Sequence, residues 1–487
     1  MASLKNKYLR ISSIWRLLAL ILCFTLSFSV LSGCKENGPK TLRVLIDESD
    51  YDDTLGIHSQ LNKWVAQFEA EHEGVTVVLE VLPLDSKSRN PMIQQIRSEL
   101  MSGNGPDVIL MPNAYSDRAA AGSGQNPLIN DVSLAMKNGL FLDISKYYNE
   151  DIELGTDKLQ QTVMDAGVMG DARYVLPLRY DIPVMYVDKQ AFSETGLSQD
   201  IFECNVIDLM NNVVTIDDNR TAANFRMHWI QPQFTMNFLP SLVDYDTGKV
   251  TVSQADLELF FQSYQNYWVR LLHAFSDSAL SNRPVFYQYL SDGDYWTDTG
   301  NFMFIGSMQH AVENVTIAKI KNVELEMYPV RSMDGSVIAD VTYYGAISAG
   351  CQNPELAYEF LRAFLTEDFQ WERNLTDVRG AWKPAGYGWP VRSEGSYAAL
   401  TESIWARSEW TFSNNANKIP KEALLGNDCA ILSTKIDGAR FSIPLEPSFY
   451  RDLWMLYKKE TKTPSDVDIS QLAQEWLEKI QLHLDEG

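Results

Sequence analysis

The chain has 487 residues and a formal net charge of −23, with 64 acidic residues against 41 basic ones. An acidic surface repels phosphate backbones, so nucleic acid is not an expected partner. The chain is longer than one hydrophobic core normally organises, and its 45% hydrophobic residues suffice for more than one core. Two domains are therefore expected.

The N-terminal segment predicts export. A basic start precedes an apolar run over residues 17–31, and a run of about fifteen residues is too short for a comfortable membrane span but typical of a secretory signal. The basic residues are Lys5, Lys7, Arg10 and Arg16. Removing residues 1–33 leaves 37 of the 41 basic residues against 64 acidic ones, a net charge of −27. No later apolar segment approaches membrane-spanning length.

Cys34 closes the sequence Leu31-Ser32-Gly33-Cys34, which resembles the lipobox of bacterial lipoproteins. The resemblance implies cleavage before Cys34, acylation of this residue, and attachment to the outer face of a membrane by lipid. The alternatives are an ordinary signal peptide and an uncleaved anchor, each with an incidental cysteine.

Cys23 lies in the signal segment. The three cysteines of the body, Cys204, Cys351 and Cys429, allow at most one disulfide, and we expect buried free thiols. Neither the cysteines nor the six scattered histidines show metal-site spacing. The chain also has no phosphate-binding Gly-Lys-Ser/Thr loop and no Gly-Xaa-Ser-Xaa-Gly nucleophile turn. We therefore predict no metal, no cofactor and no catalytic residue.

Strands and helices alternate in the first part of the chain. Apolar periodicity predicts strands over 41–46, 75–81 and 107–111, with helices over 61–71 and 91–101 between them. Gly74 is expected to end the first helix. This order is typical of an α/β fold with a largely parallel sheet. Further helices are predicted over 257–272, from Asn353 as N-cap with Pro354 in the first turn, and over 468–484.

Ligands of such sheets bind beyond the carboxyl ends of the strands. The polar residues at these positions are Asp47 and Glu48 after the first strand, and Asn113, Tyr115, Asp117 and Arg118 after the third. The alternative for Asp117 and Arg118 is an ion pair with each other on the surface.

Several segments, in order, resemble the extracellular solute-binding proteins of bacterial ABC importers, in the large sugar-binding class that includes the maltose-binding protein. They are the helix 61–71 with 74–77, the Gly-rich turn 102–108, the stretch 138–144, residues 174–178 with 185–189, 244–251, 344–354, and 388–392. The chain departs from the family at Met308, where a Trp is common, and at Asp188, where an Asn is common.

The resemblance implies a two-lobed periplasmic-binding-protein fold of the Venus flytrap type, each lobe a mainly parallel sheet flanked by helices. The expected divisions are a signal peptide over 1–33, a tether over 34–40, an N-terminal lobe over 41–182 and 333–375, and a C-terminal lobe over 183–332 and 376–487. Three crossings near residues 182, 332 and 376 would form the hinge.

Sugar sites combine aromatic planes with carboxylates or amides that hydrogen-bond to hydroxyl groups. Tyr180 and Asp181, just before the first crossing, are the leading candidates, and the alternative for them is a packed hinge. The resemblance adds Tyr343 and Tyr344 in a family ligand loop, and the segment of Phe449, Tyr450 and Arg451. The acidic alternation over 244–248 lacks the rest of a calcium loop and predicts a turn between strands.

The sequence therefore predicts a lipid-anchored, extracytoplasmic, monomeric receptor that captures a sugar or oligosaccharide and delivers it to ABC permease subunits. Two alternatives stay open: a secreted carbohydrate-active enzyme, and a binding protein for a peptide or another non-sugar solute. A pair of carboxylates cannot distinguish the enzyme, because so acidic a chain always contains one.

Overall fold

The computed structural model describes residues 40–47, 57–83, 85–113, 127–223, 225, 236–239, 241–274, 303–308, 311, 314, 315, 318, 323–367, 369, 370, 388–392, 431 and 434–486. The signal segment and Cys34 lie outside these residues. No helix in the described ranges combines the length and the apolar content needed to cross a bilayer.

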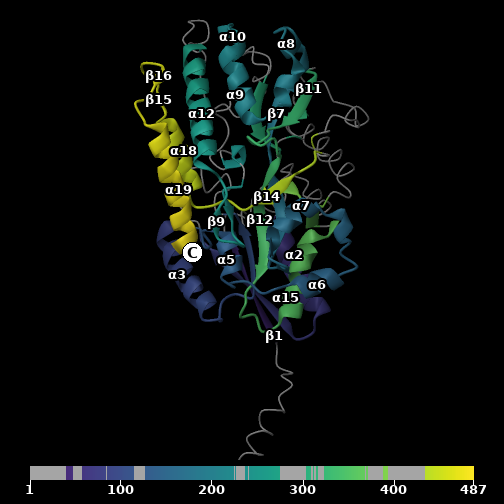
Figure 1. The fold of residues 1–487 in the computed structure, drawn as a ribbon. Helices are drawn as coiled ribbons and strands as arrows, with labels where there is room; N and C mark the ends of the chain where they lie inside the picture. Colours follow the sequence, from purple (N-terminus) through teal and green to yellow (C-terminus); the bar gives the residue numbers. More distant parts are fainter. Residues whose placement is uncertain are drawn as a thin grey trace, which may run out of the picture.

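Seven described strands form the sheet of the first lobe, in the lower half of Figure 1. Their order is β13-β6-β12-β3-β1-β2, and β14 pairs with the start of β12. The strands are β1 (Lys40–Asp47), β2 (Val75–Leu82), β3 (Val108–Pro112), β6 (Val175–Asp181), β12 (Ile338–Ile347), β13 (Trp389–Pro390) and β14 (Gly438–Arg440). The three strands predicted near the N-terminus are confirmed to within a residue or two.

Helices α2 (Ile57–Glu71), α3 (Ser86–Met101), α5 (Val132–Lys137), α6 (Ser145–Glu150), α7 (Gln161–Met164) and α15 (Pro354–Arg362) surround this sheet. Phe68 of α2 packs edge-on against Phe360 of α15, with ring centroids 5.2 Å apart. Gly74 has φ of +80° and ends the turn after α2, as predicted.

Two predicted helix starts need correction. Helix α3 begins at Ser86 rather than near Pro91, because the Asp85 side chain accepts hydrogen bonds from the backbone N–H groups of Lys87 and Ser88. Pro354 does occupy the first turn of α15, but the Asn353 side chain makes no capping hydrogen bond.

The second lobe, in the upper half of Figure 1, has a sheet of three described strands in the order β10-β7-β11. They are β7 (Pro183–Asp188), β10 (Met303–Ser307) and β11 (Leu325–Pro329). The helices are α8 (Lys189–Ser193), α9 (Val206–Thr215), α10 (Asn219–Ala222), α12 (Gln254–Ala274), α18 (Glu446–Trp454) and α19 (Ile469–Glu486). Figure 1 shows α12, α18 and α19 together along one flank, and α19 extends toward the first lobe.

The described structure also contains short hairpins. They are β4 (Val168–Met169) with β5 (Ala172–Arg173), β8 (Val243–Asp244) with β9 (Lys249–Val250), and β15 (Tyr457–Lys458) with β16 (Thr463–Pro464). The Asp244 carboxylate accepts hydrogen bonds from the backbone N–H groups of Asp246 and Thr247. The acidic segment 244–248 is therefore a turn between strands, as predicted.

The α/β class with two lobes is confirmed, but the sheets are not mainly parallel. Strand β1 runs parallel to β2 and β3, but β12 is antiparallel to both β3 and β6. In the second sheet, β7 is antiparallel to β10 and to β11. Parallel neighbours need a crossover connection of a dozen or more residues. Strand β6 instead leaves the first lobe and β12 returns to it, so these two strands run in opposite directions.

The chain crosses between the lobes where β6 leads into β7 and again between β11 and β12. A third crossing lies near residue 442, since Phe441 belongs to the first hydrophobic core and Ile443 to the second. The sequence placed this crossing near 376. That position lies outside the described residues, but β13 and β14, which follow it in the chain, pair with β6 and β12 in the first sheet.

Candidate functional site

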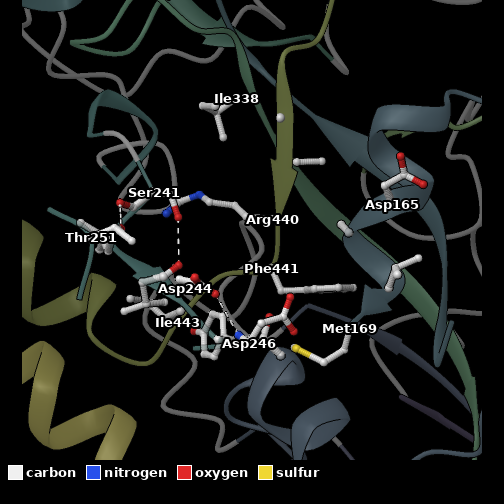
Figure 2. A pocket seen from close by; sticks show the side chains of 18 of the residues that line it. Asp165, Met169, Ser241, Asp244, Asp246, Thr251, Ile338, Arg440, Phe441 and Ile443 are labelled. Atoms are coloured by element: carbon white, nitrogen blue, oxygen red, sulfur yellow. Dashed lines mark hydrogen bonds between the residues drawn. The ribbon is translucent and has the colours of Figure 1, made fainter. Parts of the chain in front are cut away.

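A cavity of about 450 Å³ lies between the lobes beside the third crossing. Figure 2 shows Asp165 and Met169 of the first lobe on one side, and Ser241 and Thr251 of the second lobe on the other. The lining residues are Ser133, Met136, Asp165, Ala166, Val168, Met169, Leu239, Ser241, Leu242, Val243, Asp244, Tyr245, Asp246, Thr251, Ile338, Gly438, Ala439, Arg440, Phe441 and Ile443. Both lobes therefore contribute walls to one space, whose volume suits a small ligand.

The lining combines the aromatic rings of Phe441 and Tyr245 with hydroxyl, carboxylate and guanidinium groups. Three carboxylates, those of Asp165, Asp244 and Asp246, occur in this lining. Arg440 already has protein partners: its Nε lies 3.1 Å from Asp340 Oδ1 and donates to Asn237 Oδ1 at 3.0 Å. The cavity is thus equipped for hydroxyl-bearing ligands more than for anions.

Arg440 belongs to a buried polar cluster at the hinge. Asn237 Nδ2 donates to Asp340 Oδ2 at 2.8 Å, and Arg440 Nη2 lies 3.4 Å from Glu446 Oε1. Burial raises the pKa of Asp340 to about 6, against the opposing effect of Arg440. Burial also raises the pKa of Glu446, to about 8, and the nearby charge of Asp340 adds to this rise. One guanidinium therefore faces two carboxyl groups whose pKa values burial raises above their ordinary values.

The predicted residues at the strand ends have protein partners. Arg89 Nη2 lies 2.6 Å from Asp47 Oδ2, and both side chains are buried. Asn113 Nδ2 donates to the Val341 carbonyl at 2.8 Å and to Ser442 Oγ at 3.1 Å. Asn113 thereby joins the end of β3 to the third crossing.

The remaining predicted residues of this group are Glu48, Tyr115, Asp117 and Arg118, and all four lie outside the described residues.

Tyr180 and Asp181 lie at the first crossing and are buried, with relative exposures of 4% and 1%. The Asp181 carboxylate accepts hydrogen bonds from the Ser307 hydroxyl and from the backbone N–H of Ile182. Burial, and secondarily the charge of Asp181, raises the pKa of Tyr180. Asp181 therefore links β6 of the first sheet to β10 of the second, a hinge contact.

The other predicted aromatic residues divide between core and surface. Tyr343 and Tyr344 are buried in β12, and Tyr344 packs edge-on against Phe441 at 5.6 Å. Phe449 lies in the second core, with its ring 4.9 Å from that of Trp476.

Tyr450 is half-buried beside Trp454, with ring centroids 5.9 Å apart, and Arg451 is exposed. None of the predicted site residues in the described ranges lines the cavity of Figure 2. Sequence reasoning missed the cavity because its walls come from distant segments. The turn at 244–248 was the one local signal near it.

Metal-ligating groups give no further site. In the part of the chain that the structure describes, no three His, Cys, Asp or Glu side chains gather as a metal site. Cys204 and Cys351 are free and partly buried, and burial raises the pKa of both thiols. Cys429 lies outside the described residues.

Two lobes, each with its own core, joined by crossings and enclosing a space lined by both, define a hinged two-lobed binding protein. A family model described as bacterial extracellular solute-binding protein matches residues 52–371. The chain belongs to this family.

Solved structures with the same fold include an extracellular solute-binding protein of family 1 from Alicyclobacillus acidocaldarius. It is 14% identical to this chain, with a TM-score of 0.51, over 92% of this chain and 100% of that one. A periplasmic oligogalacturonide-binding protein from Yersinia enterocolitica is 12% identical, also with a TM-score of 0.51, over 92% of this chain and 99% of that one. No curated protein sequence matches the chain.

Proposed function

We propose that this solute-binding protein captures a sugar or oligosaccharide between its two lobes and delivers it to the permease of an ABC importer. The observation that carries the proposal is the space at the hinge, because its walls come from both lobes. A solute that touches both lobes binds one relative orientation better than another, and this difference in affinity drives closure. The permease would then distinguish the loaded form by the orientation of the lobes.

The ligand class rests on chemistry and on the family resemblance of the sequence. Phe441 contributes an apolar aromatic wall, and Ser241, Thr251 and Asp244 contribute hydrogen-bonding groups. The solved protein from Yersinia enterocolitica is described as binding an oligogalacturonide. Its likeness to this chain concerns the fold, so the acidic sugar is not carried over. Arg440 already pairs with Asp340 and Glu446, so its charge is not needed for an acidic sugar, and a neutral sugar is favoured here.

We further propose that Cys34 carries a lipid that holds the receptor on the outer face of the membrane, with residues 35–40 as tether. Cys34→Ala should leave the fold intact and release the protein from membranes, because the cysteine supplies only the anchor. Membrane partitioning of the full-length protein and the variant measures this. Equal partitioning of both would overturn the lipid anchor.

A thermal-shift screen of residues 35–487 against neutral oligosaccharides, with uronates and short peptides as comparison ligands, tests the receptor function. A ligand at a hundred times its Kd adds about 2.7 kcal/mol to stability, which a melting curve resolves. Calorimetric titration and solution scattering should then show micromolar binding and a smaller radius. Binding of peptides alone, an unchanged radius, or turnover of a bound sugar would overturn the proposal.

Two tryptophan variants then locate the solute. Met169→Trp fills the cavity of Figure 2 from the β4–β5 hairpin. Met101→Trp is the matched control, since Met101 is 86% exposed on α3. Loss of affinity in Met169→Trp alone places the solute in this cavity. Unchanged affinity in both variants directs the search to the strand ends at Asp47 and Asn113.

A further inference from the structure

The carboxylate of Asp131 contacts three separate segments. Its Oδ1 accepts a hydrogen bond from the backbone N–H of Leu134 at 2.9 Å and caps α5. Its Oδ2 accepts one from the Tyr245 hydroxyl at 2.8 Å and lies 2.7 Å from Nε2 of His483. The side chains of Asp131 and His483 are 4% and 15% exposed. The two oxygens of Asp131 thus cap α5 locally and contact two residues that are distant in the chain, Tyr245 and His483.

The distant partners belong to the other lobe. Asp131 precedes Val132 and Met136 of the first core, whereas Tyr245 packs against the second core from the β8–β9 turn. His483 lies in the last turn of α19, beside Leu484 of the second core. Asp131 therefore holds both α19 and the β8–β9 hairpin against the first lobe.

A second contact reinforces the same junction. The backbone N–H of Gly170, in the β4–β5 turn of the first lobe, donates to Asp246 Oδ1 at 3.0 Å. Asp246 follows Tyr245 directly in the β8–β9 turn. The hairpin is therefore bound to the first lobe at two adjacent residues, through partners that are far apart in the chain.

We propose that Asp131 is an inter-lobe latch, which holds the two lobes in one relative orientation through Tyr245 and His483. Hydrogen bonds of 2.7–2.8 Å to a buried carboxylate are strong and tolerate little displacement. A rotation about the crossings changes the distance between α5 and the β8–β9 turn. Any hinge motion of the receptor must therefore break or rebuild this latch.

The latch gives the proposed function a conformational control. A receptor whose lobes rotate during capture must lose the latch in one of its two states, so the latch sets their relative populations. This consequence rests on the proposed function. The latch itself does not, because it joins the lobes without a solute.

Two substitutions weaken the latch with little other change. In Asp131→Asn the amide oxygen still caps α5, but the Nδ2 group can only donate, so neutral hydrogen bonds at most replace the two charge-assisted bonds to Tyr245 and His483. Tyr245→Phe removes one hydroxyl and keeps the ring. Asp485→Asn is the matched control, since Asp485 is an exposed residue of α19 that accepts a hydrogen bond from Gln481 within the helix.

The experiment measures the protein without any added solute. Amide hydrogen exchange over residues 243–250 should quicken about tenfold in Asp131→Asn and in Tyr245→Phe, since a lost bond to a charged group costs at least 1.4 kcal/mol, a factor of ten. Scattering should show a changed distribution of lobe orientations. Asp485→Asn should match the wild type in both measurements.

A double variant sharpens the test. If both single changes remove one shared hydrogen bond, the double variant should exchange no faster than Asp131→Asn alone. Additive effects would overturn the shared bond. Wild-type exchange and scattering in Tyr245→Phe would overturn the latch, and this variant decides the matter if Asp131→Asn fails to fold. Absence of sugar binding would contradict the proposed function and leave these results unaffected.

Discussion

The two lobes build their cores in different ways. The first lobe packs helices against a sheet of seven described strands, and its core is rich in aliphatic residues from those strands. The second lobe has three described strands, and aromatic side chains of α12, α18 and α19 supply much of its core. There the ring of Phe449 stacks on that of Phe260 and meets the ring of Trp476 edge-on.

The comparison shows where polar groups are buried in this protein. The aromatic stack of the second lobe is apolar, whereas two ion pairs with buried carboxylates lie at a strand end and a crossing of the first lobe: Asp47 with Arg89, and Asp340 with Arg440. A hinge needs partners that hold a defined geometry, and charged hydrogen bonds provide it at the cost of desolvation. Substitutions in the aromatic core and at the buried ion pairs should therefore destabilise different lobes.

Trp476→Ala should have the largest effect, because it removes a fully buried ring from the second core. We expect a loss of about 3–5 kcal/mol in unfolding free energy. Calorimetry should show that the transition of the second lobe falls further than that of the first. Trp454→Ala is the control, since Trp454 is 43% exposed, and an equal loss in both variants would contradict the distinction between core and surface.

Asp47→Ala should cost about 3 kcal/mol, because Arg89 is left buried without its carboxylate. Urea unfolding measures this loss, which should fall on the first lobe. Removing the exposed Arg451 by Arg451→Ala should change stability by less than about 0.5 kcal/mol. A stable Asp47→Ala that loses only solute affinity would mean that Asp47 serves the ligand rather than the fold.

Gly388→Ala should destabilise the junction of β13 with β6 by about 2 kcal/mol. Gly388 has φ of +114°, and an added Cβ would lie 2.7 Å from the Tyr180 carbonyl oxygen. Gly196→Ala is the matched control: Gly196 has φ of +70° with no atom within 4 Å of an added Cβ, so about 1 kcal/mol is expected. Equal losses of stability would mean that the close approach of Gly388 to Tyr180 does not constrain the junction of β13 with β6.

Glu446→Gln should change Tm least at low pH and progressively more as the pH rises. Burial raises the pKa of Glu446 from its ordinary 4.5 to about 8, so the folded protein holds a proton that the unfolded chain has lost. Stability contributed by this group therefore falls as the pH rises from about 4.5 to about 8. The variant should show a shallower fall in Tm across this window.

Glu478→Gln, an exposed change on α19, should keep the wild-type slope of Tm against pH. A wild-type slope in Glu446→Gln as well would show that this carboxyl group titrates normally. The raised pKa of Asp340 should leave part of the slope in both variants, because its proton is also lost near neutral pH.

The sequence predicted the parts of the fold whose signals are local and repeated. Long helices such as α12 and α19 follow from apolar residues at helical spacing, and β1 and β3 from short apolar runs. Membership of the solute-binding family likewise followed from short motifs in order. The third crossing was not predictable in this way, because β13 and β14 have two and three residues and show no periodicity.

The candidate site was less predictable than the fold. The strand-end rule selected Asp47 and Asn113, and the structure pairs both with protein groups. The resemblance selected Asp181, which the structure places in a hinge contact with Ser307. As solute contacts these residues stay predictions.

By itself the amino-acid sequence determined the family, the alternation of strands and helices, and the acidic turn at 244–248, because propensity and periodicity act over a few residues. Only the tertiary structure decided which strands return antiparallel, where the cavity of Figure 2 lies, and that Asp131 meets His483, 352 residues further along the chain. The physical reason is that burial and hydrogen bonding act on whatever groups the folded chain brings within about 3 Å, regardless of their separation in sequence.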